Sequence, residues 1–152
     1  MKASIIALCL AAAAGSFGSP GHARPGGSIE YLGIPTPLRG AMQPKYPDNC
    51  VGFIRNDMGV RLPNVNLTSW AAKQGIVNWR GDPRYGDVAI IAVPTGEAAA
   101  NGHIALVQEV TATSITIVEA NFRKGQVTMR RATGRNLADA AAQLRIYGYY
   151  RP

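Results

Sequence analysis

A helical spacing of apolar residues begins directly after Asp48 and Asn49, two residue types that cap helix N-termini well. The spacing predicts a helix that starts at Cys50. We expect it to end at Gly59, because glycine readily adopts the left-handed conformation of a C-terminal cap. Three apolar residues share one face of this helix, which we expect to be buried: Val51, Ile54 and Met58.

A second short helix is predicted over residues 68–73, before Gly75, with Trp70 and Ala71 as its packing residues. From Asp82 onward the apolar residues follow the period of an extended chain. Strands are predicted over residues 88–93, 103–110, 114–119, 126–131 and 145–150, and a short helix over residues 137–144. Because helices come first and strands follow with short connections, the order predicts an α+β domain in which N-terminal helices pack on an antiparallel sheet.

The N-terminal region follows neither period. Lys2 precedes the apolar run of residues 5–14, and small residues up to Ala23 complete the pattern of a secretory signal peptide cleaved after Ala23. The run is shorter than the ~20 residues that span a bilayer, so a retained membrane anchor is the weaker alternative. Residues 24–42 are rich in Pro and Gly and are predicted to form a linker. One domain is expected over residues 43–152.

The charge balance of the chain is basic. It contains 16 Lys and Arg against nine Asp and Glu, and removing Lys2 with the leader leaves 15 basic residues and a net charge of +6. The arginines are scattered, which favours long-range attraction to anionic surfaces such as bacterial envelope polymers. No basic helix or aromatic–basic motif is present, so nucleic acid is not an expected partner. We expect a monomer without stable membrane insertion once the leader is removed.

Removal of the leader also changes the set of reactive side chains. Cys9 and His22 leave with it, so the mature chain keeps one cysteine, Cys50, and one histidine, His103. An exported chain with a single cysteine forms no internal disulfide, and such a thiol is reactive or intermolecular. One Cys and one His are too few ligands for a structural zinc site. At a helix N-terminus the partial positive charge favours the thiolate, which is the nucleophilic form.

The pairing of the two strands after Gly102 can be worked out from the turn between them. If residues 111–113 form a three-residue turn, Val110 pairs with Ser114. Counting back along both strands then places His103 opposite Asn121. The register therefore predicts that these two side chains lie on the same side of the sheet.

Glu119 lies on this side as well, as a diagonal neighbour of His103 at roughly 7–8 Å between backbones. A one-residue slip would send Glu119 to the other side. The other members of this face are apolar: Ala105, Val107, Ile115 and Ile117. We therefore expect this face to pack against the helix of Cys50, where the small side chain of Ala105 leaves room.

These residues supply the parts of thiol catalysis. Cys50 would attack a carbonyl, and His103 would accept its proton and later give one to the leaving amine. Glu119 or Asn121 would orient the imidazole. Plainer interpretations stay open: a core cysteine, a surface histidine, a salt bridge of Glu119 with an arginine such as Arg123, and an Asn121 that only begins a turn.

Four blocks of the sequence carry a family resemblance. They are Asp48-Asn49-Cys50-Val51-Gly52-Phe53, Gly86-Asp87-Val88-Ala89, Gly102-His103-Ile104-Ala105-Leu106-Val107 and Val118-Glu119-Ala120-Asn121-Phe122. In this order they resemble the CHAP domain, the cysteine, histidine-dependent amidohydrolases/peptidases, over about residues 43–152. The resemblance implies a papain-like α+β fold and cleavage of amide bonds in peptidoglycan peptides. It also implies Cys50 as nucleophile, His103 as general base, Glu119 as orienting residue and Asn121 as a polar fourth residue.

Two positions depart from the family pattern. Asn49 stands where the family often has Gln, so Asn49 is a candidate substrate-binding residue, and we expect the Cys50 N–H and a nearby side chain to be the oxyanion donors. Only Asp48 stands where some relatives carry an acid-rich calcium loop, so neither a metal nor another cofactor is expected. Three aromatic residues are further candidates for substrate binding, with a core role as the alternative: Trp70, Trp79 and Tyr85.

These features predict an exported bacterial cysteine amidase or endopeptidase, secreted or periplasmic, that hydrolyses peptidoglycan peptides through an acyl-enzyme on Cys50. One alternative keeps the same residues and acts as an amidase or transpeptidase on a peptide conjugate outside the wall. The other alternative is a catalytically silent, wall-associated binding module.

Overall fold

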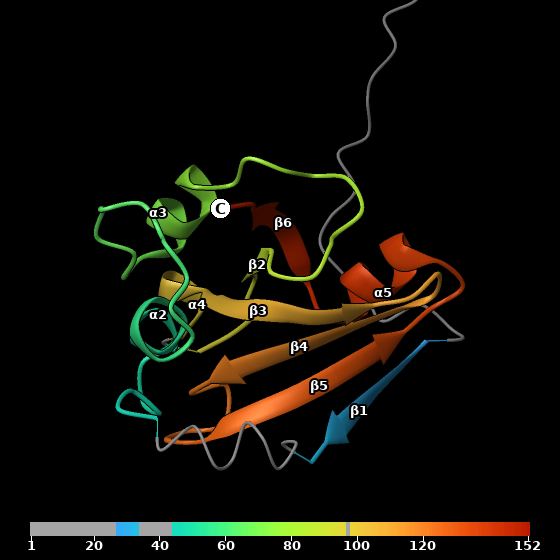
Figure 1. Cartoon of the computed structure of the whole chain (residues 1–152), viewed down its shortest axis with the longest axis horizontal. Coiled ribbons are helices and arrows are strands. Elements are labelled where there is room, and N and C mark those ends of the chain that lie inside the picture. The colour runs from blue at the N-terminus through green and yellow to red at the C-terminus, as the bar shows by residue number, and fades with distance from the viewer. Residues whose placement is uncertain (1–26, 34–43, 97) are drawn as a thin grey trace, which may run out of the picture.

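The computed structural model of the chain describes residues 27–33, 44–96 and 98–152, so the predicted signal peptide and residues 24–26 and 34–42 of the predicted linker lie outside it. Its strands are β1 (Ser28–Leu32), β2 (Val88–Ile91), β3 (His103–Val110), β4 (Ser114–Ala120), β5 (Val127–Thr133) and β6 (Ile146–Tyr150). They form one antiparallel sheet in the order β1-β5-β4-β3-β2-β6 (Figure 1).

Short helices cover this sheet. They are α2 (Cys50–Gly52) with its π-helical continuation η1 (Phe53–Asp57), α3 (Trp70–Gly75), α4 (Ala98–Asn101) and α5 (Leu137–Gln143). The helices α2, α3 and α4 gather at the end of the sheet where β3 begins, and α5 lies toward the other end (Figure 1). The predicted α+β class is confirmed. Within the described residues, no helix is long and apolar enough to cross a membrane.

Part of the predicted linker is a strand. Ser28–Leu32 forms β1 and pairs antiparallel with β5, with Leu32 opposite Met129. Four of the five residues of this strand are exposed, including the large side chains of Ile29 and Tyr31. The segment alternates polar and apolar residues, but it is short and lies between Pro- and Gly-rich stretches, which explains why this strand was missed.

The helix that begins at Cys50 turns differently from the prediction. Over η1 the backbone bonds span five residues, as in the bond of 2.9 Å from the Met58 N–H to the Phe53 carbonyl. This wider turn rotates the buried face. Phe53 and Ile54 are fully buried, whereas Val51 and Met58 are only partly buried.

The sheet has an apolar core on each face, and the helix of Cys50 packs on the face opposite to the predicted one. One core comprises Phe53, Ile54, Leu62, Leu67, Val88, Ile90, Ile104, Leu106, Val118, Ala120 and Met129. The other comprises Ala89, Ile91, Ala105, Val107, Ile115, Ile117, Ala132, Ala140, Leu144 and Tyr149, so the face of Ala105 packs against α5. Because both faces are apolar, the alternation along β3 does not indicate which face the helix covers.

The hairpin of β3 and β4 departs from the predicted register at its turn. Val110 pairs with Ile115 rather than with Ser114. A bulge between Val107 and Glu109 then adds one residue to β3. The turn geometry assumed from the sequence was therefore wrong by one residue.

Beyond the bulge the pairing returns to the predicted register, with Leu106 opposite Val118. The bulge thus cancels the shift at the turn. As a result, Glu119 at the end of β4 lies on the same side of the sheet as His103 at the start of β3, where their side chains form a hydrogen bond.

The Gly86-Asp87 block connects the start of β2 to the C-terminus. The buried carboxylate of Asp87 accepts hydrogen bonds from Arg151 Nε at 2.9 Å and Nη2 at 2.8 Å. It also accepts one from the Arg84 N–H at 3.0 Å. Asp87 therefore fastens the end of the chain to the loop before β2, which is a structural role.

We expect Asp87→Ala to lower the free energy of unfolding by about 2 kcal/mol, because it removes charged hydrogen bonds from a buried site. The matched control is Glu109→Ala, since Glu109 pairs with Arg131 on the surface and should contribute less than about 1 kcal/mol. Urea denaturation of both variants measures the difference. Equal losses in the two variants would contradict the role assigned to Asp87.

Candidate active site

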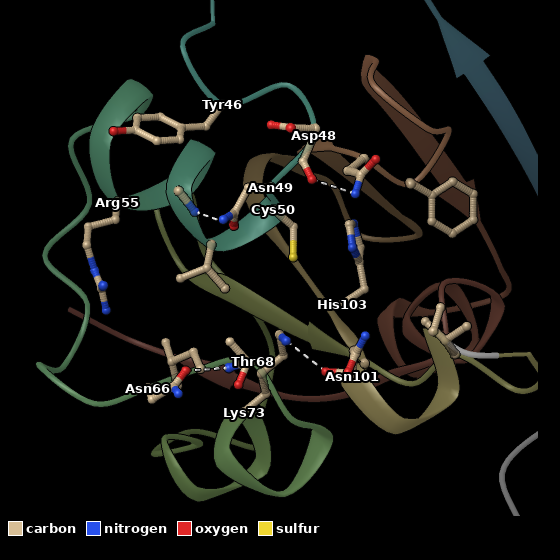
Figure 2. Close-up of a pocket in the computed structure, with 18 of the residues that line it drawn as sticks. Tyr46, Asp48, Asn49, Cys50, Arg55, Asn66, Thr68, Lys73, Asn101 and His103 are labelled. Carbon is tan, nitrogen blue, oxygen red and sulfur yellow. Dashed lines mark hydrogen bonds between the residues drawn. The ribbon is translucent and has the colours of Figure 1, made fainter.

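A cavity of about 590 Å³ opens beside the N-terminal end of α2. Its walls come from the chain around α2, the loop of residues 65–68, α3, α4 and the start of β3. Cys50 and His103 both line it, and Figure 2 shows the sulfur of Cys50 directed toward the His103 ring. The two residue types expected to react therefore lie on one accessible wall.

Asn49 fixes the position of Cys50. It has extended backbone, with φ of −140°, and its Oδ1 accepts a hydrogen bond of 2.9 Å from the Gly52 N–H. This is the N-cap interaction that Asn favours, and it starts the helix at Cys50. Asn49 also lines the cavity, as the sequence predicted for a substrate-binding residue, although its side-chain oxygen serves the cap.

Gly102 allows the turn that places His103 at the start of β3. Its φ is +61°, and a Cβ atom there would lie 2.4 Å from Cε3 of Trp70. Only glycine satisfies both requirements. The Trp70 ring thus packs directly beneath the residue that precedes the histidine.

The imidazole of His103 is held in place by the carboxylate of Glu119. Its Nε2 lies 3.0 Å from Glu119 Oε2. The sulfur of Cys50 points toward the same ring (Figure 2), and the two groups shift each other's pKa. Because Nε2 is engaged by Glu119, Nδ1 is the ring nitrogen left to exchange a proton with the sulfur.

Glu119 is fully buried and is held in turn by β5. Arg130 donates from Nε to Oε1 at 2.5 Å and from Nη2 to Oε2 at 2.9 Å, and Thr128 donates to Oε1 at 3.3 Å. The ion pair that the sequence left open for Glu119 is formed with Arg130 rather than with Arg123. It does not replace the histidine contact, since the carboxylate makes both.

The electrostatics of the site favour a thiolate. Burial alone would raise the pKa of the Cys50 thiol, but His103, the charge of Lys73 and the Ile104 N–H hold that pKa below its ordinary value. Burial would lower the pKa of His103, but Cys50 and Glu119 raise it to about 9. The two directions agree, so the site favours a thiolate and an imidazolium over the neutral pair.

The carboxylate that orients the ring is ionised. Burial would raise the pKa of Glu119, but hydrogen bonds and charges from His103 and Arg130 hold the pKa below its usual range. An ionised Glu119 can only accept hydrogen bonds, so the proton between the two residues stays on His103 Nε2.

Asn121 lies at the site but does not bond the imidazole. Its Nδ2 donates to the Asp48 carbonyl at 2.7 Å, and its Oδ1 accepts from the Gly125 N–H at 3.0 Å. Its φ of +64° is typical of a turn residue. Asn121 therefore begins the turn after β4, as one alternative held, and also ties that turn to the segment before Cys50.

The three aromatic candidates for substrate binding lie outside this cavity. Trp70 packs edge-on against Tyr147, Trp79 is covered on one face by the Arg151 guanidinium, and Tyr85 is 71% exposed. The aromatic residues that do line the cavity are Tyr46 and Phe122. Neither was predicted, because each follows a turn or loop residue rather than a periodic segment.

A CHAP domain family model matches residues 40–121 of the chain. The chain belongs to the CHAP domain family. CHAP domains are generally hydrolases of the amidase and peptidase type, and the matched segment contains Cys50, His103 and Glu119. No curated protein and no solved structure matches the chain. Among the residues that the structure describes, no group of three or more His, Cys, Asp or Glu side chains is placed to hold a metal ion.

Arg130 and Lys73 are two charged residues of the site that the sequence reasoning missed. Arg130 lies beyond the end of the CHAP match. Carrying the register argument from β4 on to β5 would have found it, because Glu119 pairs with Thr128 and Arg130 is then the diagonal neighbour on the same face. Lys73 gave no signal, since a lysine in a short helix is normally exposed.

We expect iodoacetamide to alkylate Cys50 at pH values below the ordinary pKa of a thiol, with the rate falling only as the pH falls through the lowered pKa. His103→Ala removes the imidazolium that lowers the pKa of the thiol, so the midpoint of the pH–rate profile should rise by at least about one pH unit. Glu109→Ala is the control and should leave the midpoint in place. A midpoint unchanged by His103→Ala would rule out the ion pair.

We expect Arg130→Met to destabilise the CHAP domain by about 3 kcal/mol, because it leaves the buried Glu119 without its main counter-charge. Arg131→Met is a matched control one residue away, where the guanidinium binds the exposed Glu109, and should cost less than about 1 kcal/mol. Denaturation measures both values. Equal stabilities for the two variants would contradict the role given to Arg130.

Proposed function

We propose that this CHAP domain is an exported bacterial cysteine amidase or endopeptidase that hydrolyses amide bonds of peptidoglycan peptides through an acyl-enzyme on Cys50. One observation carries the proposal: the Cys50 sulfur points toward the His103 ring on the wall of an open cavity (Figure 2), and Glu119 holds Nε2 of that ring. Family membership supports amide hydrolysis as the reaction type.

In the acylation step the Cys50 thiolate attacks the carbonyl carbon of the scissile amide. The carbonyl electron pair moves to oxygen, and a tetrahedral intermediate forms. The His103 imidazolium then gives its Nδ1 proton to the leaving nitrogen. The C–N bond breaks, the amine product leaves, and a thioester on Cys50 and a neutral imidazole remain.

The developing oxyanion would be stabilised at the start of α2. The N–H groups of the first turn of a helix have no intrahelical acceptor, and the Cys50 N–H is the first of them. It lies next to the sulfur in the chain, so a carbonyl attacked by the sulfur would have its oxygen near this donor. The Asn49 cap supports this arrangement, because it fixes where the helix begins.

Deacylation reverses the proton transfers. Neutral His103 takes a proton from a water molecule, the resulting hydroxide attacks the thioester carbon, and the C–S bond breaks to give the thiolate and a carboxylic acid product. Glu119 stays ionised throughout. It orients the ring and stabilises the imidazolium each time it forms.

Two properties of the chain support the wall as the substrate. The basic net charge would attract the mature domain to anionic envelope polymers. The leader pattern of residues 1–23 would export it to the compartment where those polymers lie.

The test is digestion of purified sacculi with the mature protein, followed by mass spectrometry of the released fragments. We expect new stem-peptide termini, and we expect Cys50→Ala or His103→Ala to reduce their rate of release by about 10⁴-fold or more. Glu109→Ala should retain full activity. Absence of new termini with the wild type would refute the wall as substrate, and undiminished release by Cys50→Ala would refute the acyl-enzyme.

A further inference from the structure

A buried lysine forms part of the cavity wall. Lys73 of α3 is 2% exposed and yet lines the same cavity as Cys50. Its Nζ donates a hydrogen bond of 2.7 Å to the Asn101 carbonyl in α4. In Figure 2 the Lys73 side chain extends toward Cys50, and its ammonium is at the end nearer to the sulfur.

The contacts of this ammonium leave it short of negative charge. A protonated lysine has three N–H groups, and Asn101 accepts from one of them. Within the described residues, the thiolate of Cys50 is the one charge that acts on the pKa of Lys73, and it only partly offsets the lowering caused by burial. Burying a cation is costly unless an anion or several acceptors compensate it.

The remaining charges of the cavity do not supply that anion. Among its described lining residues Asp48 is the one acid, and Asp48 is exposed. Arg55 lines the cavity as a second cation and bonds the Pro63 carbonyl at 3.1 Å. The cavity around the sulfur is therefore positive on balance and would attract an anionic group.

The proposed reaction increases this need for an anion. When Cys50 is acylated, its thiolate becomes a neutral thioester, and Lys73 loses the one charge that offsets its burial. A carboxylate supplied by the bound substrate would remain in place through both steps. If Lys73 only stabilised the resting thiolate, its ammonium would have no anionic partner after acylation.

We propose that Lys73 is an anion subsite that selects peptide substrates with a free side-chain or terminal carboxylate next to the scissile amide. The preference for such a peptide rests on the proposed function, whereas the anion site at Lys73 does not depend on it. It deepens that function by naming a chemical feature of the substrate.

The anion site can be tested with two small alkylating agents of similar size, iodoacetate and iodoacetamide. Both react with the same Cys50 thiolate with loss of iodide, so the ratio of their rates cancels any change in thiolate reactivity. Iodoacetate carries the carboxylate that Lys73 would bind. We expect Lys73→Met to lower the iodoacetate to iodoacetamide rate ratio by about 10-fold, the size expected for one charge-assisted hydrogen bond.

Lys124→Met is the matched control, because Lys124 is exposed, lies outside the cavity lining and carries the same charge. Its ratio should stay within about 2-fold of the wild type, as expected when an exposed charge is removed. Lys73→Gln serves as a second variant if Lys73→Met shows a reduced melting temperature. A ratio that Lys73→Met and Lys73→Gln leave unchanged, or that Lys124→Met lowers equally, overturns the anion site.

The substrate assignment is tested with two synthetic peptides that differ only by a carboxylate or a carboxamide next to the scissile amide. We expect the wild type to favour the carboxylate peptide by about 10-fold in kcat/KM and Lys73→Met to cleave both peptides alike. Equal cleavage by the wild type refutes the substrate preference while the hydrolase proposal stands. A Lys73-dependent alkylation ratio without cleavage of either peptide or of sacculi refutes the hydrolase and the substrate preference but keeps the anion site.

Discussion

The candidate site depends on a carboxylate that has no exposed surface. Removing a carboxylate from water costs several kcal/mol unless opposite charge and hydrogen bonds replace the lost solvent. For Glu119 this replacement comes from Arg130 and His103, which lie on the two neighbouring strands. One side chain on β4 thereby connects β3 and β5. The interaction that makes the ionised carboxylate tolerable inside the sheet is also the one that sets the orientation of the imidazole.

The second requirement is that the sulfur and the imidazole meet although their elements bury different faces. The helix that begins at Cys50 packs on the face of Ile104, whereas His103 belongs to the face that α5 covers. They meet because Cys50 is the first residue of its helix and His103 is the first residue of its strand. A sheet buried on both faces gives this meeting point a stiff support.

Much of this site follows from the sequence, for identifiable reasons. Cys50 and His103 are identified because the predicted mature chain keeps no other cysteine or histidine. Glu119 is identified from the two-residue period of strands, because the bulge in β3 compensates for the one-residue error in the predicted turn. The face beneath the helix does not follow, since both faces are apolar. Lys73 does not follow either, because its burial depends on how α3 meets α4 and not on its own segment.

The bulge between Val107 and Glu109 separates two parts of one hairpin. Between the bulge and the turn, the register is the one set by the turn, with Val110 opposite Ile115. Beyond the bulge, the register is the one that brings His103 to Glu119. A change in length at the tip can therefore be absorbed before it reaches the reactive end. The tip around residues 111–113 is accordingly the natural place to insert a tag or a reporter peptide without displacing the side chains of the candidate site.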